Sequence, residues 1–326
     1  MDDVKHSAGF DISRLVMRFA HKIRPLARDG VDSSVPVGSA QYLVRNNDRL
    51  KQLKKRYAGH PAGRHSLWSE SYLKREIKLT HFRADNAYVY QKRYANDATY
   101  ALTTQYVLAH DSFGLLTRLP EDELFGNNVI DFDGKLLVSR DLLDSVLEIS
   151  FLQRELNFAS SPQWSMLDIG AGYGRFAHRV VAAIPNLDRI FCTDAIAEST
   201  FISEYYLKFR GVDGKAMVVP LDEVEDTLSN TRVDLAVNIH SFGECTLTSI
   251  SWWLDLLRAN KTRFLFIVAN GEGLGSTETD KTNIDYLPVI LESGYRLKTK
   301  EAKYCDSPSV QRHGLYPTNY FLFERQ

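Results

Sequence analysis

The residues with the most specific chemistry lie between Met166 and Arg175, where an acidic side chain is followed by closely spaced glycines. The pattern Asp-x-Gly-x-Gly-x-Gly is formed by Asp168, Gly170, Gly172 and Gly174. Glycine lacks a Cβ, so its backbone can adopt positive φ and approach a ligand closely. The dinucleotide fingerprint G-x-G-x-x-G would require glycine where Arg175 stands, which disfavours a dehydrogenase. The segment therefore predicts a loop that holds a small ligand, with Asp168 available to a cationic or hydroxyl group.

A second group of polar residues follows the apolar run that begins at Val233. Asn238, His240 and Glu244 lie close together in this segment. The ordinary pKa of histidine suits a general base near neutral pH, so His240 is a candidate catalytic base; a capping or loop hydrogen bond is the alternative. Glu244 is a candidate to orient His240, to act as the base itself, or to begin the next helix, where acidic residues are favoured. His313, between the last two predicted strands, is a further catalytic candidate.

The C-terminal half of the chain supplies the elements that must position these residues. From about residue 163, short apolar strands alternate with helices, a pattern typical of a doubly wound α/β sheet. Strands are predicted at 166–169, 189–193, 215–219, 233–239, 263–268, 295–304 and 320–324. In such sheets the ligand binds beyond the carboxyl ends of the strands, where the strand order reverses. The glycine loop, which follows the first of these strands, is expected at that point.

The glycine-loop pattern resembles that of class I S-adenosylmethionine (SAM)-dependent methyltransferases, and five strand–helix units before a terminal hairpin fit the sheet of that class. The resemblance implies a Rossmann-like α/β fold with seven mostly parallel strands and an antiparallel strand at the C-terminus. It also implies SAM as the cofactor and S-adenosylhomocysteine (SAH) as the product. Asp168, the three glycines and Asn238 are the residues that the resemblance places at the cofactor.

Two further acidic residues follow the second and third predicted strands. Asp194 stands 24 residues after Gly170, close to the offset of about 20 residues at which an acid binds ribose hydroxyls in dinucleotide folds. The alternative for Asp194 is a helix N-cap, worth about 1 kcal/mol. Asp222 is a candidate to face the adenine amine. Because Glu223 and Glu225 crowd the same segment, an exposed turn carboxylate is the alternative for Asp222.

Several segments together resemble the sugar O-methyltransferase family, over about residues 65–326. These segments are Phe82–Gln91, Glu121–Gly126, Val138–Ser145, the glycine loop and Asn238–Glu244. The resemblance implies methylation of a sugar hydroxyl, in a sugar that is free, linked to a nucleotide, part of a glycan or attached to a metabolite. A methyl acceptor of this kind must be held close to the methyl donor and lose a proton as the bond forms.

The segments before residue 150 contain side chains that suit sugar hydroxyls, because they offer forked donors and paired acceptors. The candidate substrate-binding residues are Arg83, Asp85, Asn86, Gln91, Arg140 and Asp141. Arg140 and Asp141 could equally form an ion pair that joins domains. Trp68 and Trp253 are predicted to pack in the core. Residues 1–160 are predicted to form a mainly helical domain that covers the substrate, with 1–60 the least defined part, and residues 161–326 the SAM-binding domain.

Composition narrows the class of protein further. The chain has 326 residues, of which 44% are hydrophobic and 25% charged. Its net charge of −1 provides no excess of basic residues for binding nucleic acid. No apolar run approaches the roughly 20 residues that span a bilayer, so we expect no membrane insertion and a cytoplasmic protein. The basic segment Arg45–Arg56 is interpreted as a solvated helix face. A homo-oligomer is compatible with the sequence, and the expected partner is a small-molecule or oligosaccharide substrate.

A metal site is not indicated by the sequence. Its three cysteines match no metal-ligand spacing. No clear acidic pair for Mg²⁺ is present, although Glu244 with Asp111 or Asp141 is a pairing that a chelator would test. Two other functions remain open at this point. One is a methyltransferase for a phenol or amine of a natural product, and the other is a SAM-binding scaffold or partner subunit without catalysis.

Overall fold

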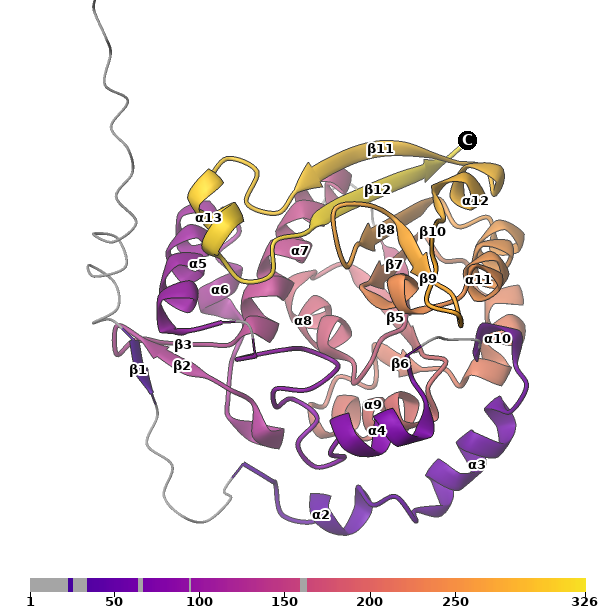
Figure 1. The fold of residues 1–326 in the computed structure, drawn as a ribbon, viewed down its shortest axis with the longest axis horizontal. Coiled ribbons are helices and arrows are strands. Elements are labelled where there is room, and N and C mark those ends of the chain that lie inside the picture. Colours follow the sequence, from indigo (N-terminus) through magenta and orange to yellow (C-terminus); the bar gives the residue numbers. More distant parts are fainter. Residues whose placement is uncertain (1–22, 26–33, 64–66, 94, 159–162) are drawn as a thin grey trace, which may run out of the picture.

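A seven-stranded sheet forms the centre of the computed structural model, which describes residues 34–63, 67–93, 95–158 and 163–326 and the backbone of 23–25. Its strands, in the spatial order β6-β5-β4-β7-β8-β12-β11 (Figure 1), are β6 (Ala216–Val218), β5 (Leu187–Thr193), β4 (Trp164–Ile169), β7 (Leu235–Ile239), β8 (Phe264–Val268), β12 (Asn319–Arg325) and β11 (Tyr295–Ala302). The first five are parallel to one another, whereas β12 is antiparallel to both β8 and β11. The predicted seven strands and the antiparallel C-terminal strand are confirmed.

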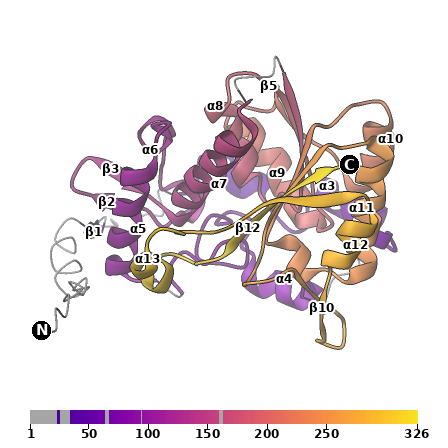
Figure 2. The ribbon, with the colours of Figure 1, turned by 90° about the horizontal axis from the view of Figure 1, so that it is seen from above.

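Helices cover both faces of this sheet, as the view in Figure 2 shows for α7 and α8 on one side and α11 and α12 on the other. The helices are α7 (Arg140–Leu156), α8 (Arg175–Ala183), α9 (Ala197–Phe209), α10 (Val224–Ser229), α11 (Leu247–Asn260) and α12 (Leu287–Glu292). Apolar residues recur at helical spacing in these segments, and they are the buried ones: in α11, Ile250, Trp253 and Leu257 are at most 2% exposed. Burial of such a stripe against the sheet is what holds each helix in place.

The point where the strand order reverses is β4. This strand lies between β5 and β7, and each of the three ends at the same edge of the sheet because all are parallel. Asp168 precedes the end of β4, Asp194 follows β5 and Asn238 lies near the end of β7. The topology therefore brings the residues of three distant sequence segments to one edge, as expected for this fold.

The N-terminal part is mainly helical but also contains a small sheet that the sequence analysis did not predict. Its helices are α2 (Ser39–Tyr42), α3 (Asp48–Tyr57), α4 (Glu70–Glu76), α5 (Asp97–His110) and α6 (Leu115–Arg118). The three strands of the small sheet are β1 (Ile23–Pro25), β2 (Ile130–Phe132) and β3 (Leu136–Val138), all antiparallel. Asp133 and Gly134 join β2 to β3 with φ of 61° and 67°. An Asp-Gly pair between apolar residues is a hairpin signal, so the sequence did contain the evidence for β2 and β3.

Short elements absent from the sequence prediction lie around the sheet. They are the hairpin β9 (Gly275–Thr277) and β10 (Asn283–Asp285), the helix α13 (Pro308–His313), and the 3-10 turns η1 (Pro61–Gly63), η2 (Leu124–Gly126), η4 (Leu221–Glu223) and η5 (Ser241–Glu244). Among the described residues, no helix combines the length and the apolar character that crossing a bilayer requires. The predicted domain boundary at residue 160 falls within 159–162, outside the described residues.

The basic segment Arg45–Arg56 is not the solvated helix face that its composition suggested. Helix α3 packs against α9, and three of its cations bind acidic residues of the C-terminal half, while Lys51 and Lys55 are exposed. Arg49 Nε lies 3.1 Å from Glu204, Lys54 Nζ 2.7 Å from Glu198 and Arg56 Nε 2.7 Å from Asp222. The interpretation was wrong because the partners are about 140 or more residues away in the sequence, and a charge pattern within one helix does not reveal them.

Candidate active site

The glycine loop after β4 has the backbone conformation that its sequence predicted. Gly170, Gly172 and Gly174 have φ of 74°, 58° and 90°, all in the region that favours glycine. A Cβ on Gly170 would lie 2.5 Å from the Cβ of Ser241, which is far inside van der Waals contact. The N–H groups of Gly170 and Ala171 both donate to the carbonyl of Thr193, so the loop is tied to the end of β5.

Replacing Gly170 with Ala is expected to destabilise the protein more than the same change at Gly211. Gly211 also has positive φ (66°), but no atom lies within 4 Å of its missing Cβ. Gly211→Ala should therefore cost about 1–2 kcal/mol, the cost of a left-handed residue with a Cβ. Gly170→Ala adds the clash with Ser241, for a total of roughly 3 kcal/mol or more. Urea unfolding measures both, and equal costs would show that Ser241 does not restrict this position.

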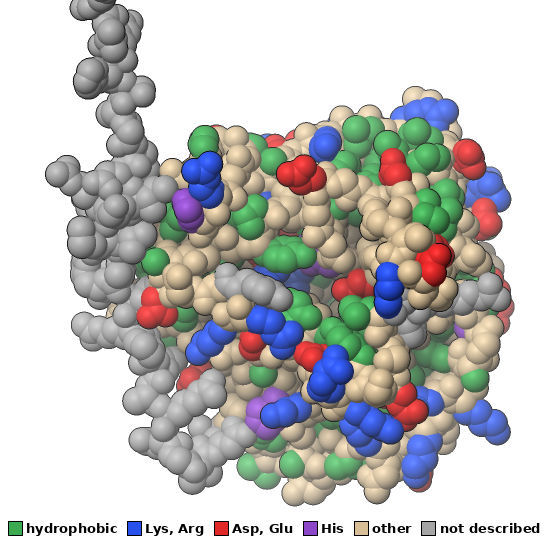
Figure 3. All heavy atoms as spheres, viewed as in Figure 1, with side chains coloured by type: hydrophobic (Ala, Val, Ile, Leu, Met, Phe, Trp, Pro, Cys, Tyr) green, Lys and Arg blue, Asp and Glu red, His purple; other side chains and the backbone are tan. Residues whose placement is uncertain are grey.

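A cavity lies at the edge of the sheet where β4, β5 and β7 end. Its empty space is about 1030 Å³, a value that includes the opening to solvent. The lining includes Asp168, Gly170, Gly172, Asp194, His240 and Glu244 from the C-terminal half, and Trp68, Tyr88, Val89, Arg140 and Asp144 from the N-terminal half. The face drawn in Figure 3 is hollowed near its centre, and acidic, basic and histidine side chains surround the hollow.

Asp168 is the most unusual residue of this cavity. It is 2% exposed, and its Oδ2 has no hydrogen-bond partner among the described residues. Burial raises the pKa of its carboxyl to about 7, against the opposing charge of Arg175. A buried acceptor without a partner is rare in folded proteins and indicates a missing donor. The oxygen therefore suits a cationic amino group of a bound ligand, in agreement with the chemistry inferred from the sequence.

Asp194 holds the loop from the neighbouring strand. Its Oδ2 accepts the N–H of Gly172 at 2.9 Å, and its Oδ1 accepts the N–H of Ile196 at 2.8 Å. The N-cap position of α9 is Ile196, without a side-chain cap, so the N-cap alternative for Asp194 is wrong. Burial raises the pKa of Asp194 to about 7. Each carboxylate oxygen can accept more than one hydrogen bond, which leaves acceptor capacity for ligand hydroxyls.

His240 directly follows β7, with a left-handed backbone (φ 67°) that is uncommon for a residue with a Cβ. Its ring lies in the cavity wall, and Nδ1 is 3.1 Å from the carbonyl oxygen of Ala269. A carbonyl only accepts, so Nδ1 carries the proton and Nε2 is an acceptor. Burial, and then the charge of Arg140, lower the pKa of His240 to about 3. The ring is therefore a neutral acceptor near pH 7 and a weak base. Its side chain does not cap η5.

Glu244 lies at the end of η5, in contact with the N-terminal half. Its Oε2 accepts the indole N–H of Trp68 at 2.7 Å. Burial raises the pKa of Glu244 to about 7, and the hydrogen bond from Trp68 opposes this rise. Trp68 was predicted to pack in the core; it packs against the core, but it is only half-buried and also lines the cavity beside Tyr88, because its polar N–H needs a partner. A carboxyl that titrates near 7 is matched to general-base work at neutral pH.

A second cleft shares Glu244 with the first. It is lined by Leu67, Tyr90, Gly243, Glu244, Asn270, Gly271, Glu272, Gly273, Gly275, Thr277, Lys281, Asn283 and Tyr316. The hairpin β9–β10 and the segment before β12 form much of its wall, two parts of the chain whose elements the sequence analysis missed. Tyr316 packs edge-on against His240, with 5.2 Å between ring centroids. Glu244, Tyr316 and His240 therefore lie between the first cavity and the second, polar cleft.

Of the predicted catalytic and cofactor-binding residues, four do not line the cofactor cavity: Gly174, Asn238, Asp222 and His313. The Asn238 amide donates to the carbonyl of Ile169 at 3.0 Å and accepts the N–H of Phe242, so it joins the ends of β4 and β7. Asp222 pairs with Arg56. His313 is exposed at the end of α13. The structure does not bring Asp222 or His313 to either cleft.

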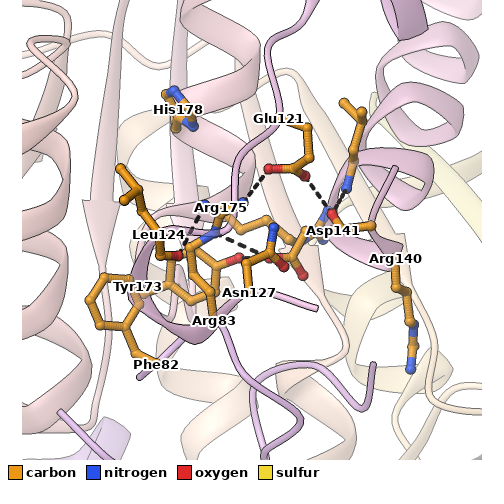
Figure 4. Close-up of polar contacts among 12 residues, drawn as sticks. Phe82, Arg83, Glu121, Leu124, Asn127, Arg140, Asp141, Tyr173, Arg175 and His178 are labelled. Carbon is orange, nitrogen blue, oxygen red and sulfur yellow. Dashed lines mark hydrogen bonds and ion pairs between the residues drawn. The ribbon is translucent and has the colours of Figure 1, made fainter. Parts of the chain in front are cut away.

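Arg83 and Asp141, both predicted to bind substrate, belong to a buried charge network that is drawn in Figure 4. Arg83 is 1% exposed and its Nη2 lies 2.5 Å from Glu121, whose other oxygen is 3.0 Å from Arg179 of α8. Asp141 accepts the hydroxyl proton of Tyr173 and lies 3.7 Å from Arg83 Nε. Buried charges need partners of opposite sign, and here these partners join the two halves of the chain. Neither residue lines a cleft.

The other predicted substrate residues fold the loop 83–91. Asp85 accepts the backbone N–H groups of Lys92 and Arg93. Asn86 binds the backbone at residues 82 and 88, and Gln91 bonds Asn127 and the N–H of residue 140. The loop presents Tyr88 to the cavity, where its ring lies over the glycine loop and its hydroxyl is 3.0 Å from Ser199. Of the six predicted substrate residues, Arg140 is the one that the structure places at the cavity.

The acidic pairings considered for Mg²⁺ are not formed. Asp111 accepts the N–H of Leu116, and Asp141 is bound to Tyr173, both away from Glu244. Within the described ranges, no group of three or more His, Cys, Asp or Glu side chains is arranged to hold a metal ion.

The chain is similar in structure to solved methyltransferases. Magnesium protoporphyrin IX methyltransferase (ChlM) from Synechocystis PCC 6803, solved with bound SAM, has 11% identity over 57% of this chain and 83% of that chain, at a TM-score of 0.40. A SAM-dependent methyltransferase from Clostridium acetobutylicum has 10% identity over 56% and 90%, at 0.38. Mitomycin 7-O-methyltransferase MmcR has 16% identity over 56% and 57%, at 0.38. No protein-family model and no curated protein matches the chain.

The strand order, the antiparallel C-terminal strand and the glycine loop are those expected of a Rossmann-like α/β fold with methyltransferase topology. At the identities and TM-scores above, the likeness carries no conclusion about the activity or the acceptor of this chain. None of these comparisons confirms the sugar O-methyltransferase family, so the acceptor has to be argued from the residues of this chain.

Proposed function

We propose that this protein is a SAM-dependent methyltransferase that methylates a hydroxyl group of a small molecule. The observation that carries the proposal is the buried Asp168 oxygen without a partner, beside a glycine loop in the same cavity. SAM supplies an electrophilic methyl group when it is bound. Asp168 suits its ammonium group, Asp194 its ribose hydroxyls, and the glycine loop allows close approach.

Glu244 is the residue that we assign as general base. It lies where the cofactor cavity meets the second cleft, so a hydroxyl bound in that cleft can reach its carboxylate. The carboxylate takes up the proton that the acceptor loses, and a pKa of about 7 suits this task. His240, a neutral acceptor, is assigned to orient the acceptor hydroxyl rather than to remove its proton.

For the acceptor we favour a sugar, bound in the second cleft. Tyr90 and Tyr316 offer flat apolar surfaces there, and Asn270 and Asn283 offer amides. Rings that carry several hydroxyl groups need both kinds of contact. In this proposal the N-terminal residues up to about 160 cover the substrate, and residues 161–326 bind SAM. A phenol or amine of a natural product is the competing acceptor.

Methyl transfer and cofactor binding test the proposal together. Calorimetry should detect binding of SAM and SAH, and a panel of free sugars, nucleotide-sugars, glycosides, phenols and amines should produce SAH with at least one class. Turnover with sugars and not with phenols or amines would support the sugar acceptor. Binding of SAM without transfer to any acceptor or partner protein would favour a non-catalytic scaffold. Absence of SAM and SAH binding would contradict the proposal.

A further inference from the structure

A cluster of buried charges lies against the cofactor cavity, next to the glycine loop. Arg140 and Lys303 are 6% and 3% exposed, and both bind Asp144, at 3.1 Å from Nε and 2.6 Å from Nζ. Arg175 pairs with Glu148 at 2.9 Å. Arg140 and Lys303 therefore share one carboxylate, while Arg175 has its own partner. A cation with donors beyond those used by its protein partner can bind an anionic group of a ligand.

Arg140 is the cation of this cluster that is free to bind such a group. It begins α7, where its backbone N–H is held by Gln91, and its guanidinium lies 4.3 Å from the ring centroid of Tyr316. Nε binds Asp144 and Nη1 donates to the carbonyl of Tyr90 at 2.8 Å. Nη2 forms no hydrogen bond within the described part of the chain. The side chain lines the cavity, and its contacts fix the guanidinium in one orientation.

The same cavity also carries the opposite charge. Asp168 contributes a buried carboxylate oxygen without a partner, as described above. Arg140, a fixed cation with an unused donor, and Asp168, a buried carboxylate with an unused acceptor, line the same cavity. Together they match a ligand that carries both a negative and a positive group. The α-amino acid end of SAM is such a group, since it carries a carboxylate and an ammonium.

We propose that Arg140 binds the carboxylate and Asp168 the ammonium of the amino acid end of the cofactor. This inference rests on the proposed SAM-dependent function, and it reassigns Arg140 from the acceptor to the cofactor. It also gives the N-terminal half a direct part in cofactor binding, because α7 precedes the glycine loop in the chain and contributes Arg140 and Asp144 to the cavity lining.

The affinities of two related ligands distinguish the contact to the amino acid end from the contacts to the rest of the cofactor. SAH and 5′-methylthioadenosine share the adenosine and the thioether, but only SAH has the amino acid end. In calorimetry, Arg140→Met and the isosteric Asp168→Asn should each weaken SAH binding roughly 10- to 100-fold, the range expected for a lost charge-assisted hydrogen bond. Binding of 5′-methylthioadenosine should stay within about twofold of the wild type, which also shows that each variant is folded.

Arg93→Met is the matched control. Arg93 also lies 4.3 Å from the centroid of a tyrosine ring, that of Tyr90, but it does not line the cavity. Its replacement should leave the affinity for both ligands unchanged. If Arg140→Met weakens both ligands equally, or neither, the assignment of the carboxylate to Arg140 is overturned, and the same result for Asp168→Asn overturns the ammonium contact. Failure of the wild type to bind either ligand would instead contradict the proposed function.

Discussion

Replacing Glu244 with Gln is expected to lower methyl transfer by about 100-fold or more while SAH binding is retained, because the amide cannot take up a proton. Gln is isosteric and its carbonyl oxygen can still accept the indole N–H of Trp68. The matched control is His240→Asn, since Asn tolerates the left-handed backbone at this position. We expect it to lose less than about tenfold. Steady-state turnover and calorimetry on both variants decide which residue is the base, and the reverse order of effects would assign His240.

The pH dependence of turnover gives an independent test of the same residue. Only the ionised carboxylate accepts a proton, so the rate should rise as the pH increases through about 7, the pKa of Glu244. His240, with a pKa lowered to about 3, does not titrate in that window, but Asp168 and Asp194, each with a pKa of about 7, do. A shift of the profile in a variant at Trp68 is therefore what assigns the rise to Glu244. Trp68→Phe removes a hydrogen bond that stabilises the carboxylate, so the rise should move to higher pH. An unchanged profile in this variant would mean that the Trp68 contact does not tune the base.

Replacing Glu121 with Gln is expected to destabilise the protein by about 3–5 kcal/mol, because Arg83 and Arg179 would keep buried charges without their shared partner. The exposed neighbour Glu123 is the matched control, and Glu123→Gln should change the free energy of unfolding by less than about 0.5 kcal/mol. Chemical unfolding measures both variants. If Glu121 and Arg83 were instead substrate residues, Glu121→Gln would raise KM and leave the free energy of unfolding unchanged.

The network also predicts acid sensitivity. Burial by itself would raise the pKa of Glu121, but Arg83 and Arg179 outweigh it and lower the pKa to about 2. The pKa of this carboxyl is lower in the folded state than its ordinary value of about 4.5. Its ionised form therefore stabilises the fold fully at pH values above about 4.5, and this contribution is lost as the pH falls toward 2. Unfolding measured between pH 6 and 3 should therefore show a smaller loss of stability in Glu121→Gln than in the wild type.

Much of the C-terminal half could be predicted because its signals are local. An apolar stripe such as Ile250, Trp253 and Leu257 indicates both the helical period and the buried face, and it falls within α11. The glycines of the loop are required because their backbone φ is positive, which depends on each residue by itself. Asp168 and Asp194 could be found because they lie at the carboxyl ends of strands that alternate with helices.

The acceptor residues could not be predicted in the same way, because polar residue types do not reveal whether a side chain is used inside the protein. Arg83 and Asp141 have side chains that could bind sugar hydroxyls, yet both form ion pairs with buried partners in the network of Figure 4. Conversely, Trp68 looked like a core residue and contacts Glu244 instead. Each of these outcomes depends on a partner that is tens to nearly two hundred positions away.

By itself, the sequence determined the class of fold and the position of the glycine loop, because periodicity and positive φ are encoded within short segments. Only the tertiary structure decided which charges compensate one another and which remain directed at the cavity. Arg140 and Asp141 are neighbours in the sequence, but the helix turn sends one to the cavity wall and the other into the network with Arg83. The physical reason is that burial makes every charge depend on partners, and these come from distant parts of the chain.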